Sequence, residues 1–168
     1  MNSTDVAHAL LDRLGSVDGV RLVLAGPAGI GKTSAAIAIG AIVPDTVHVE
    51  HDRLKRSVWP CPCSVAYFDL RDCFGPHMVP GSLVLDTGGG TIFRPGKDNE
   101  GRLAQLLDFK QEHHLAIALL VAPYAVVKER HLRFPGSSEA HFDDYWSEWE
   151  SLELPFWRRA TDLELDVS

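Results

Sequence analysis

The sequence predicts a three-layer α/β/α fold built on a five-stranded parallel sheet. Five short apolar runs alternate with helical segments, an order typical of parallel strands joined by crossover helices. A glycine-rich loop of the form G-x-x-x-x-G-K-[ST] occupies 26–33, directly after the first run. The 168 residues are 45% apolar, which suffices for one globular domain over 1–168 and not for a second.

Hydrophobic periodicity predicts the individual elements. A first helix, capped by Thr4 or Asp5, is expected to end at Gly15, since glycine readily takes the left-handed conformation at a helix C-terminus. Near-continuous apolar runs predict strands at 20–25, 46–50, 82–86, 115–121 and 162–167. Helical spacing predicts helices at 33–42, about 64–74, 99–113 and 139–152, the last with its aromatic residues packed on the core.

The loop at 26–33 has the residues that a nucleotide phosphate requires. Its glycines let backbone N–H groups turn toward the β-phosphate, and Lys32 adds a positive charge across the β- and γ-phosphates. The Thr33 hydroxyl can ligate Mg²⁺, and the following helix adds its positive N-terminal end. The predicted nucleotide-binding residues are Gly26, Ala28, Gly29, Ile30, Gly31, Lys32, Thr33 and Ser34.

Two further clusters follow strand ends, and parallel strands bring their carboxyl ends to one edge of the sheet. Asp52 is the predicted acceptor-side carboxylate, which orients or deprotonates a hydroxyl; the alternative is a helix N-cap. Asp86 ends the third strand and has the form of an acid that holds Mg²⁺, directly or through water; a capping role is again the alternative. Gly88, Gly89 and Gly90 follow, and would let an acceptor lie against bare backbone.

The segment 128–138 is expected to form a short lid. It follows the fourth strand and is dense in cations, at Lys128, Arg130, His131 and Arg133. We expect Arg130 and Arg133 to be solvated without ligand, and at least one of them to reach the β- and γ-phosphates when nucleotide and acceptor are bound. The alternative is a charged surface whose cations pair with Glu129, Glu139 or Asp143.

Composition bounds the partners. A net charge of −7 argues against a general nucleic-acid-binding surface. No apolar stretch approaches about 18 residues, and the N-terminus has no basic segment before an apolar one, so neither a membrane span nor a signal peptide is expected. We therefore expect a cytoplasmic protein.

The odd number of cysteines fits a reducing compartment better than a disulfide framework. Cys61, Cys63, Cys73 and His77 offer four ligands that could close a zinc site. Their spacing matches no common zinc motif, which favours ordinary thiols.

What accompanies the phosphate loop narrows the reaction class. The sequence has no Asn-Lys-x-Asp guanine reader and no ABC-type signature, and it is too short for the second domain of a large ATPase. A small phosphotransferase that uses ATP and Mg²⁺ and binds a small-molecule acceptor remains the favoured reading.

The stretch 84–90, Val-Leu-Asp-Thr-Gly-Gly-Gly, followed by Arg94 and Pro95, resembles the substrate-side glycine motif of shikimate kinases. The lid cations and the stretch 154–162 resemble their lid and their approach to the last strand, and gluconate kinases and small antibiotic-modifying phosphotransferases share this core. The resemblance implies the P-loop kinase fold of the nucleoside monophosphate kinase superfamily and an ATP:alcohol phosphotransferase. It also implies an acceptor region at about 52–80 in which Asp52 faces the acceptor, with Arg71 and Arg94 as acceptor-side cations and Arg130 stabilising transferred charge.

Two departures from the family pattern bear on the substrate. Shikimate kinases carry an arginine two positions before the proline that corresponds to Pro155, and Glu153 stands there instead. The second strand ends in Glu50-His51-Asp52 rather than in Asp-x-Asp. A neutral or cationic acceptor is therefore expected instead of shikimate. The alternatives are a nucleotide kinase of the same fold, a P-loop NTPase acting as a switch or accessory protein, and a nucleotide-binding module without turnover.

Overall fold

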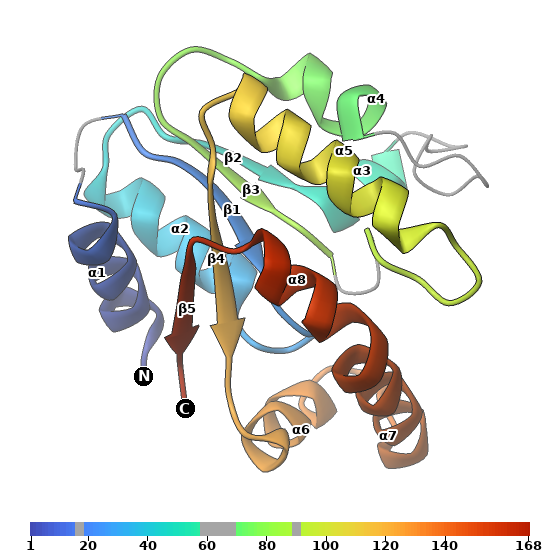
Figure 1. Ribbon diagram of the computed structural model, residues 1–168. Coiled ribbons are helices and arrows are strands. Elements are labelled where there is room, and N and C mark those ends of the chain that lie inside the picture. The colour runs from blue at the N-terminus through green and yellow to red at the C-terminus, as the bar shows by residue number, and fades with distance from the viewer. Residues whose placement is uncertain (16–18, 58–69, 89–91) are drawn as a thin grey trace.

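Figure 1 shows the computed structural model, which describes residues 1–15, 19–57, 70–88 and 92–168. Five strands form one parallel sheet in the order β2-β3-β1-β4-β5, which confirms the predicted fold class. The strands are β1 (Arg21–Ala25), β2 (Val47–Glu50), β3 (Leu83–Asp86), β4 (Ala116–Val121) and β5 (Leu163–Asp166). Each lies within its predicted range.

Helices cover both faces of the sheet because β1, β3 and β4 bury side chains on both sides. Leu22 and Leu24 pack with α1 (Ser3–Leu14) and α2 (Lys32–Ile42). Val23 and Ala25, which alternate with them, belong to the cluster formed with α4 (Leu70–Phe74), α5 (Asn99–Glu112) and α8 (Leu154–Ala160). The other helical segments are α3 (His51–Ser57), η2 (Gly75–His77), α6 (Tyr124–Leu132), α7 (Glu139–Glu148) and η3 (Trp149–Glu153).

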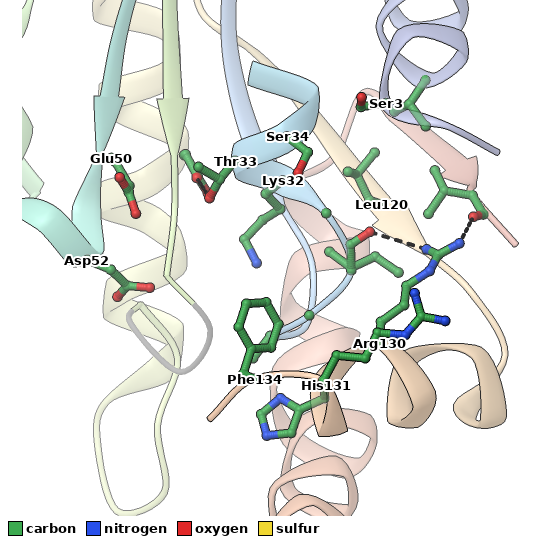
Figure 2. A pocket seen from close by; sticks show the side chains of 18 of the residues that line it. Ser3, Lys32, Thr33, Ser34, Glu50, Asp52, Leu120, Arg130, His131 and Phe134 are labelled. Carbon is green, nitrogen blue, oxygen red and sulfur yellow. Dashed lines mark hydrogen bonds between the residues drawn. The ribbon is translucent and has the colours of Figure 1, made fainter. Parts of the chain in front are cut away.

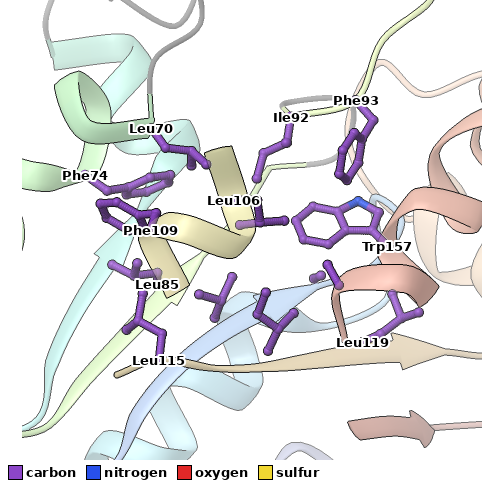
Figure 3. Packing of buried hydrophobic residues seen from close by; sticks show 14 of the residues in the cluster. Leu70, Phe74, Leu85, Ile92, Phe93, Leu106, Phe109, Leu115, Leu119 and Trp157 are labelled. Carbon is purple, nitrogen blue, oxygen red and sulfur yellow. The ribbon is translucent and has the colours of Figure 1, made fainter. Parts of the chain in front are cut away.

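Aromatic side chains fill the space between the sheet and α4, α5 and α8 (Figure 3). The Phe93 ring lies 5.0 Å from that of Phe156 and 5.2 Å from that of Trp157, in stacked and edge-on arrangements. Burying one such side chain stabilises the fold by about 1.5–3 kcal/mol. This core holds Phe93, in the described part of the β3–α5 connection, against α8.

β1 and β3 are neighbours in the sheet, but the helices that follow them lie on opposite faces. The helix after β1 lies in the α1–α2 layer, whereas the helix after β3 lies in the α5–α8 layer. Parallel sheets bind ligands in the crevice that such a divergence leaves. In Figure 1, α6 and α7 lie beyond the carboxyl end of β4.

Two details differ from the sequence-based expectation. Asn2 is the N-cap of α1 in place of Thr4 or Asp5, because its side chain accepts from the Asp5 N–H while the Asp5 carboxylate accepts from the Asn2 N–H. The helix expected at 139–152 continues to Ala160 through a π-helical turn, η3, which precedes Pro155. Proline donates no backbone hydrogen bond, and a π turn accommodates the unpaired carbonyl.

Two other expectations about the helices are confirmed. Gly15 ends α1 with φ of 66°, and Phe142 and Trp149 are buried in the core. Of the helix expected at 64–74, α4 is the part that falls within the described residues. No helix in the described part of the chain is long and apolar enough to cross a bilayer.

Candidate functional site

The loop between β1 and α2 is packed too closely for side chains at two of its glycines. A Cβ on Gly26 would lie 2.7 Å from the Leu120 carbonyl oxygen, and one on Gly29 would lie 3.2 Å from the N, Cα and Cβ atoms of His131. Both residues also have positive φ, at 146° and 82°. The loop is therefore held between the end of β4 and α6.

Lys32 lies inside this loop. The residue is 7% exposed, and its Nζ donates to the carbonyl oxygens of Gly26 and Pro27 at 2.9 and 3.0 Å. Burial lowers the pKa of Lys32, and the negative charges of Asp86, Asp52 and Glu153 act against that shift. The ammonium is thus bound by two carbonyl oxygens, and the three carboxylates favour its charged form.

Thr33 and Asp86 meet across the β1–β3 crevice. The Thr33 hydroxyl donates to Asp86 Oδ2 at 2.5 Å, and His48 Nε2 lies 3.8 Å from the same oxygen. Asp86 is buried at the end of β3. Thr87 fixes that end, since its N–H and its hydroxyl both donate to the Leu24 carbonyl, at 3.1 and 2.8 Å.

The oxygen donors at this point fit Mg²⁺. Magnesium prefers hydroxyl and carboxylate oxygens and is usually held by one or two protein ligands together with water and phosphate. Thr33 and Asp86 supply such a pair. Among the described residues, no group of three or more His, Cys, Asp or Glu side chains could hold a metal ion.

A cavity of about 880 Å³ opens over the loop (Figure 2). Glu50 and Asp52 lie on one side of Lys32, and Arg130 lies on the other. Met1, Ser3, Val6 and Val167 also line it, together with Ala28–Ser34, Asp86, Leu120, His131, Arg133 and Phe134. The structure therefore brings Asp52, Asp86, Arg130 and most of the predicted loop residues to one cavity.

Asp52 enters this cavity from the first turn of α3. Its side chain is 57% exposed, whereas the neighbouring His51 is fully buried with its ring 5.7 Å from that of Phe74. Because α3 begins at His51, Asp52 is inside the helix and is not the N-cap of a helix starting at Arg53. The buried His51 anchors the turn that presents the Asp52 carboxylate.

Some predicted acceptor-side residues lie elsewhere. Arg71 is half-exposed on α4 and forms an ion pair with Glu112 of α5 at 3.0 Å; neither it nor Arg94 belongs to the cavity lining. Gly88 is buried just after β3, and Gly89 and Gly90 lie outside the described residues. Cys73 is buried in α4 and His77 lies in η2, whereas Cys61 and Cys63 also fall outside the described residues.

The segment expected to be a lid is partly helical. Lys128 and Arg130 lie in α6, and the turn before α7 contains Arg133 and Phe134. Lys128 pairs with Glu139 and Asp143, each at 3.1 Å, and Arg133 pairs with Glu129, so these two cations form the surface ion pairs named as the alternative.

Arg130 differs from the expectation that it is solvated. It is half-buried and donates to the carbonyl oxygens of Ile30, at 3.4 Å, and Val167, at 3.0 Å. Arg130 therefore connects the loop to Val167, the residue that follows β5. Part of the guanidinium is therefore packed against the loop and is not solvated.

Sequence reasoning missed Tyr145. Its hydroxyl accepts the Ala28 N–H at 2.7 Å, across 117 positions of sequence. The amphipathic pattern of α7 indicates that this side chain faces the core. Nothing in the local sequence indicates that its oxygen reaches the loop.

Comparison with known proteins shows the fold. No protein-family model and no curated protein matches the sequence. A shikimate kinase from Bacteroides thetaiotaomicron superposes with a TM-score of 0.62 at 18% identity, covering 88% of this chain and 86% of that one. A shikimate kinase from Acinetobacter baumannii, solved with shikimate, gives 0.61 at 16% identity, covering 89% and 84%.

A further structural match agrees with these two. An uncharacterized protein from Eubacterium ventriosum gives a TM-score of 0.54 at 10% identity, covering 89% of both chains. The chain therefore has the P-loop kinase fold of the shikimate kinases, and the identities leave its substrate open.

Proposed function

We propose that the protein is a kinase that transfers the γ-phosphoryl group of Mg-ATP to a hydroxyl of a small molecule. The observation that carries this proposal is one cavity that contains a phosphate-binding loop around the Lys32 ammonium and, across from it, the exposed carboxylate of Asp52. Phosphoryl transfer requires positioning and charge neutralisation rather than covalent catalysis. Both requirements can be met by side chains of this cavity.

Lys32 is the proposed cation for the β- and γ-phosphates. Its ammonium has three N–H donors, and the carbonyls of Gly26 and Pro27 take two of them, so the third can bind a charged phosphate oxygen while the carbonyls hold the ammonium in place. The loop amides and the N-terminus of α2, which begins at Lys32, supply further donors. Ala28, Gly29, Ile30, Gly31 and Ser34 complete the proposed nucleotide contacts, and Gly26 contributes the carbonyl that holds Lys32.

Asp52 is the proposed acceptor-side residue. An exposed carboxylate on the cavity wall can accept the proton of an incoming hydroxyl or orient that hydroxyl toward the phosphate. Glu50 lies beside it, and Glu153 acts electrostatically on Lys32 from the same region. The negative charges of Asp52, Glu50 and Glu153 favour a neutral or cationic acceptor over one that carries a carboxylate, such as shikimate.

Thr33 and Asp86 are the proposed magnesium ligands. A bound Mg²⁺ would neutralise charge on the nucleotide phosphates. In the protein itself, the Thr33–Asp86 hydrogen bond keeps the hydroxyl and the carboxylate oriented toward one point. The negative charge of Asp86 also attracts the Lys32 ammonium, which lowers the free-energy cost of burying it.

The test is a screen of ATP consumption against pooled sugars, polyols, nucleosides, and aminoglycoside-like and nucleoside antibiotics. Asp52→Asn is the matched control, since it keeps the shape of the side chain and removes its charge. We expect one pool to stimulate ATP consumption in the wild type, and Asp52→Asn to reduce that stimulation by about 10²–10⁴-fold. Nucleoside monophosphates as the active pool would indicate a nucleotide kinase, and consumption unaffected by every pool would indicate an NTPase switch.

A further inference from the structure

One peptide group links Tyr145 to Lys32. The carbonyl of Pro27 accepts from Lys32 Nζ at 3.0 Å, and the N–H of Ala28 donates to the Tyr145 hydroxyl at 2.7 Å. Both groups belong to the peptide between residues 27 and 28. Because a trans peptide is planar, with its C=O and N–H pointing in opposite directions, fixing one group fixes the direction of the other.

From this geometry we infer that Tyr145 is a positioning residue for Lys32, an inference that rests on the proposed function. The tyrosine oxygen holds the Pro27–Ala28 peptide with its carbonyl turned into the loop, toward the ammonium. The same carbonyl also accepts the Ile30 N–H at 3.3 Å, which closes the turn. Without the tyrosine acceptor, the peptide can rotate and Lys32 loses one of its two carbonyl partners.

Tyr145 is itself held firmly enough to act as a support. Its ring lies nearly parallel to that of His131, with centroids 6.4 Å apart, and 6.2 Å from the ring of Phe142. Phe142 is fully buried. Burial raises the pKa of Tyr145, so the phenol stays neutral and offers lone pairs to the Ala28 N–H.

The two hydrogen bonds reinforce each other. The ammonium that donates to the Pro27 carbonyl polarises the peptide and makes the Ala28 N–H a better donor. In turn, the tyrosine oxygen that accepts this N–H makes the carbonyl oxygen more negative and a better acceptor. Lys32 and Tyr145 are therefore expected to act as one unit. Loss of either partner weakens the contact made by the other.

The first test is a double-mutant cycle on Mg-ATP affinity, measured by calorimetry. Tyr145→Phe keeps the ring and removes the acceptor, and we expect it to weaken binding by about threefold to tenfold, the value of one neutral hydrogen bond. In a Lys32→Ala background the same change should have no further effect. Tyr124→Phe is the control, since its hydroxyl donates to Asp143 on the surface of the neighbouring helices.

Two results would overturn the inference. Unchanged affinity in Tyr145→Phe would do so, as would an equal loss in the wild-type and Lys32→Ala backgrounds. Wild-type affinity in Lys32→Ala would remove the proposed function together with the inference. That failure is distinguishable, because it does not depend on any change at Tyr145.

A second test needs no nucleotide. In the ligand-free protein, hydrogen exchange of the Ala28 amide should accelerate by about threefold or more in Tyr145→Phe and also in Lys32→Ala, which removes no atom that contacts this amide. The Lys32→Ala result keeps the inference testable if Tyr145→Phe does not fold. An Ala28 amide that exchanges at the wild-type rate in Lys32→Ala would contradict the coupling through the peptide.

Discussion

Replacing Gly29 by alanine tests the packing of the phosphate loop against α6. The new Cβ would lie 3.2 Å from three atoms of His131, two of which are backbone. The left-handed φ of 82° adds about 1–2 kcal/mol of strain for any L-residue. Overpacking against atoms that cannot move away adds about 1–3 kcal/mol.

Gly81→Ala is the matched control. Gly81 has a similar φ of 88°, but a Cβ there would meet nothing within 4 Å. Gly81→Ala therefore introduces a side chain at a similar left-handed φ without the close contact. The difference in unfolding free energy between the two variants therefore isolates the approach of the loop to α6.

The measurement is urea unfolding of both variants, supported by thermal melts. We expect Gly29→Ala to be less stable than Gly81→Ala by about 1–3 kcal/mol, with each kcal/mol lowering Tm by about 2–4 °C in a chain of this size. His131→Ala should not rescue Gly29→Ala, because it leaves the N, Cα and Cβ atoms in place. Equal stabilities for the two glycine variants would refute the packing described here.

Three further predictions concern the charged groups of the cavity. Asp86→Asn should raise the Mg²⁺ concentration needed for half-maximal activity, whereas Asp52→Asn should lower turnover with Mg-ATP affinity nearly unchanged; titrations with the phenotypes reversed would exchange the two roles. Arg130→Ala should lower the unfolding free energy by about 1–2 kcal/mol, because the guanidinium donates to two carbonyl oxygens. A tenfold fall in turnover as well would support the expected contact with phosphate, whereas unchanged turnover would mean that Arg130 has a structural role. Because burial lowers the pKa of Lys32, we expect the ligand-free protein to lose this charge, and with it Mg-ATP affinity, below the ordinary lysine range as pH rises. An alkaline loss of affinity that persists in Lys32→Arg would belong to another group.

The sequence predicted the layers and strands because their signals are local. Val23, Leu85 and Leu119 lie in near-continuous apolar runs, which parallel strands buried on both faces require. The phosphate loop is also a local motif, and its position after β1 follows from the chain order. Asp86 could be predicted in the same way, as the last residue of such a run.

The contacts around the loop could not be predicted because they join distant segments. Arg130 was expected to be solvated, yet its acceptors are carbonyls of Ile30 and Val167, which become available only when α6 packs beside the loop. Arg71 looked like an acceptor-side cation, but in the fold it faces Glu112, 41 positions away. Charge and spacing identify candidate residues, and tertiary packing decides which of them reach the cavity.

The most direct test of the proposed function follows the γ-phosphoryl group. Wild-type protein and Lys32→Ala are incubated with γ-labelled ATP, Mg²⁺ and the acceptor pool, and the products are separated. We expect label in a phosphorylated small molecule with the wild type, and a reduction of about 10²–10³-fold with Lys32→Ala. Label found solely as inorganic phosphate, or equal transfer by the two proteins, would contradict a kinase built on this loop.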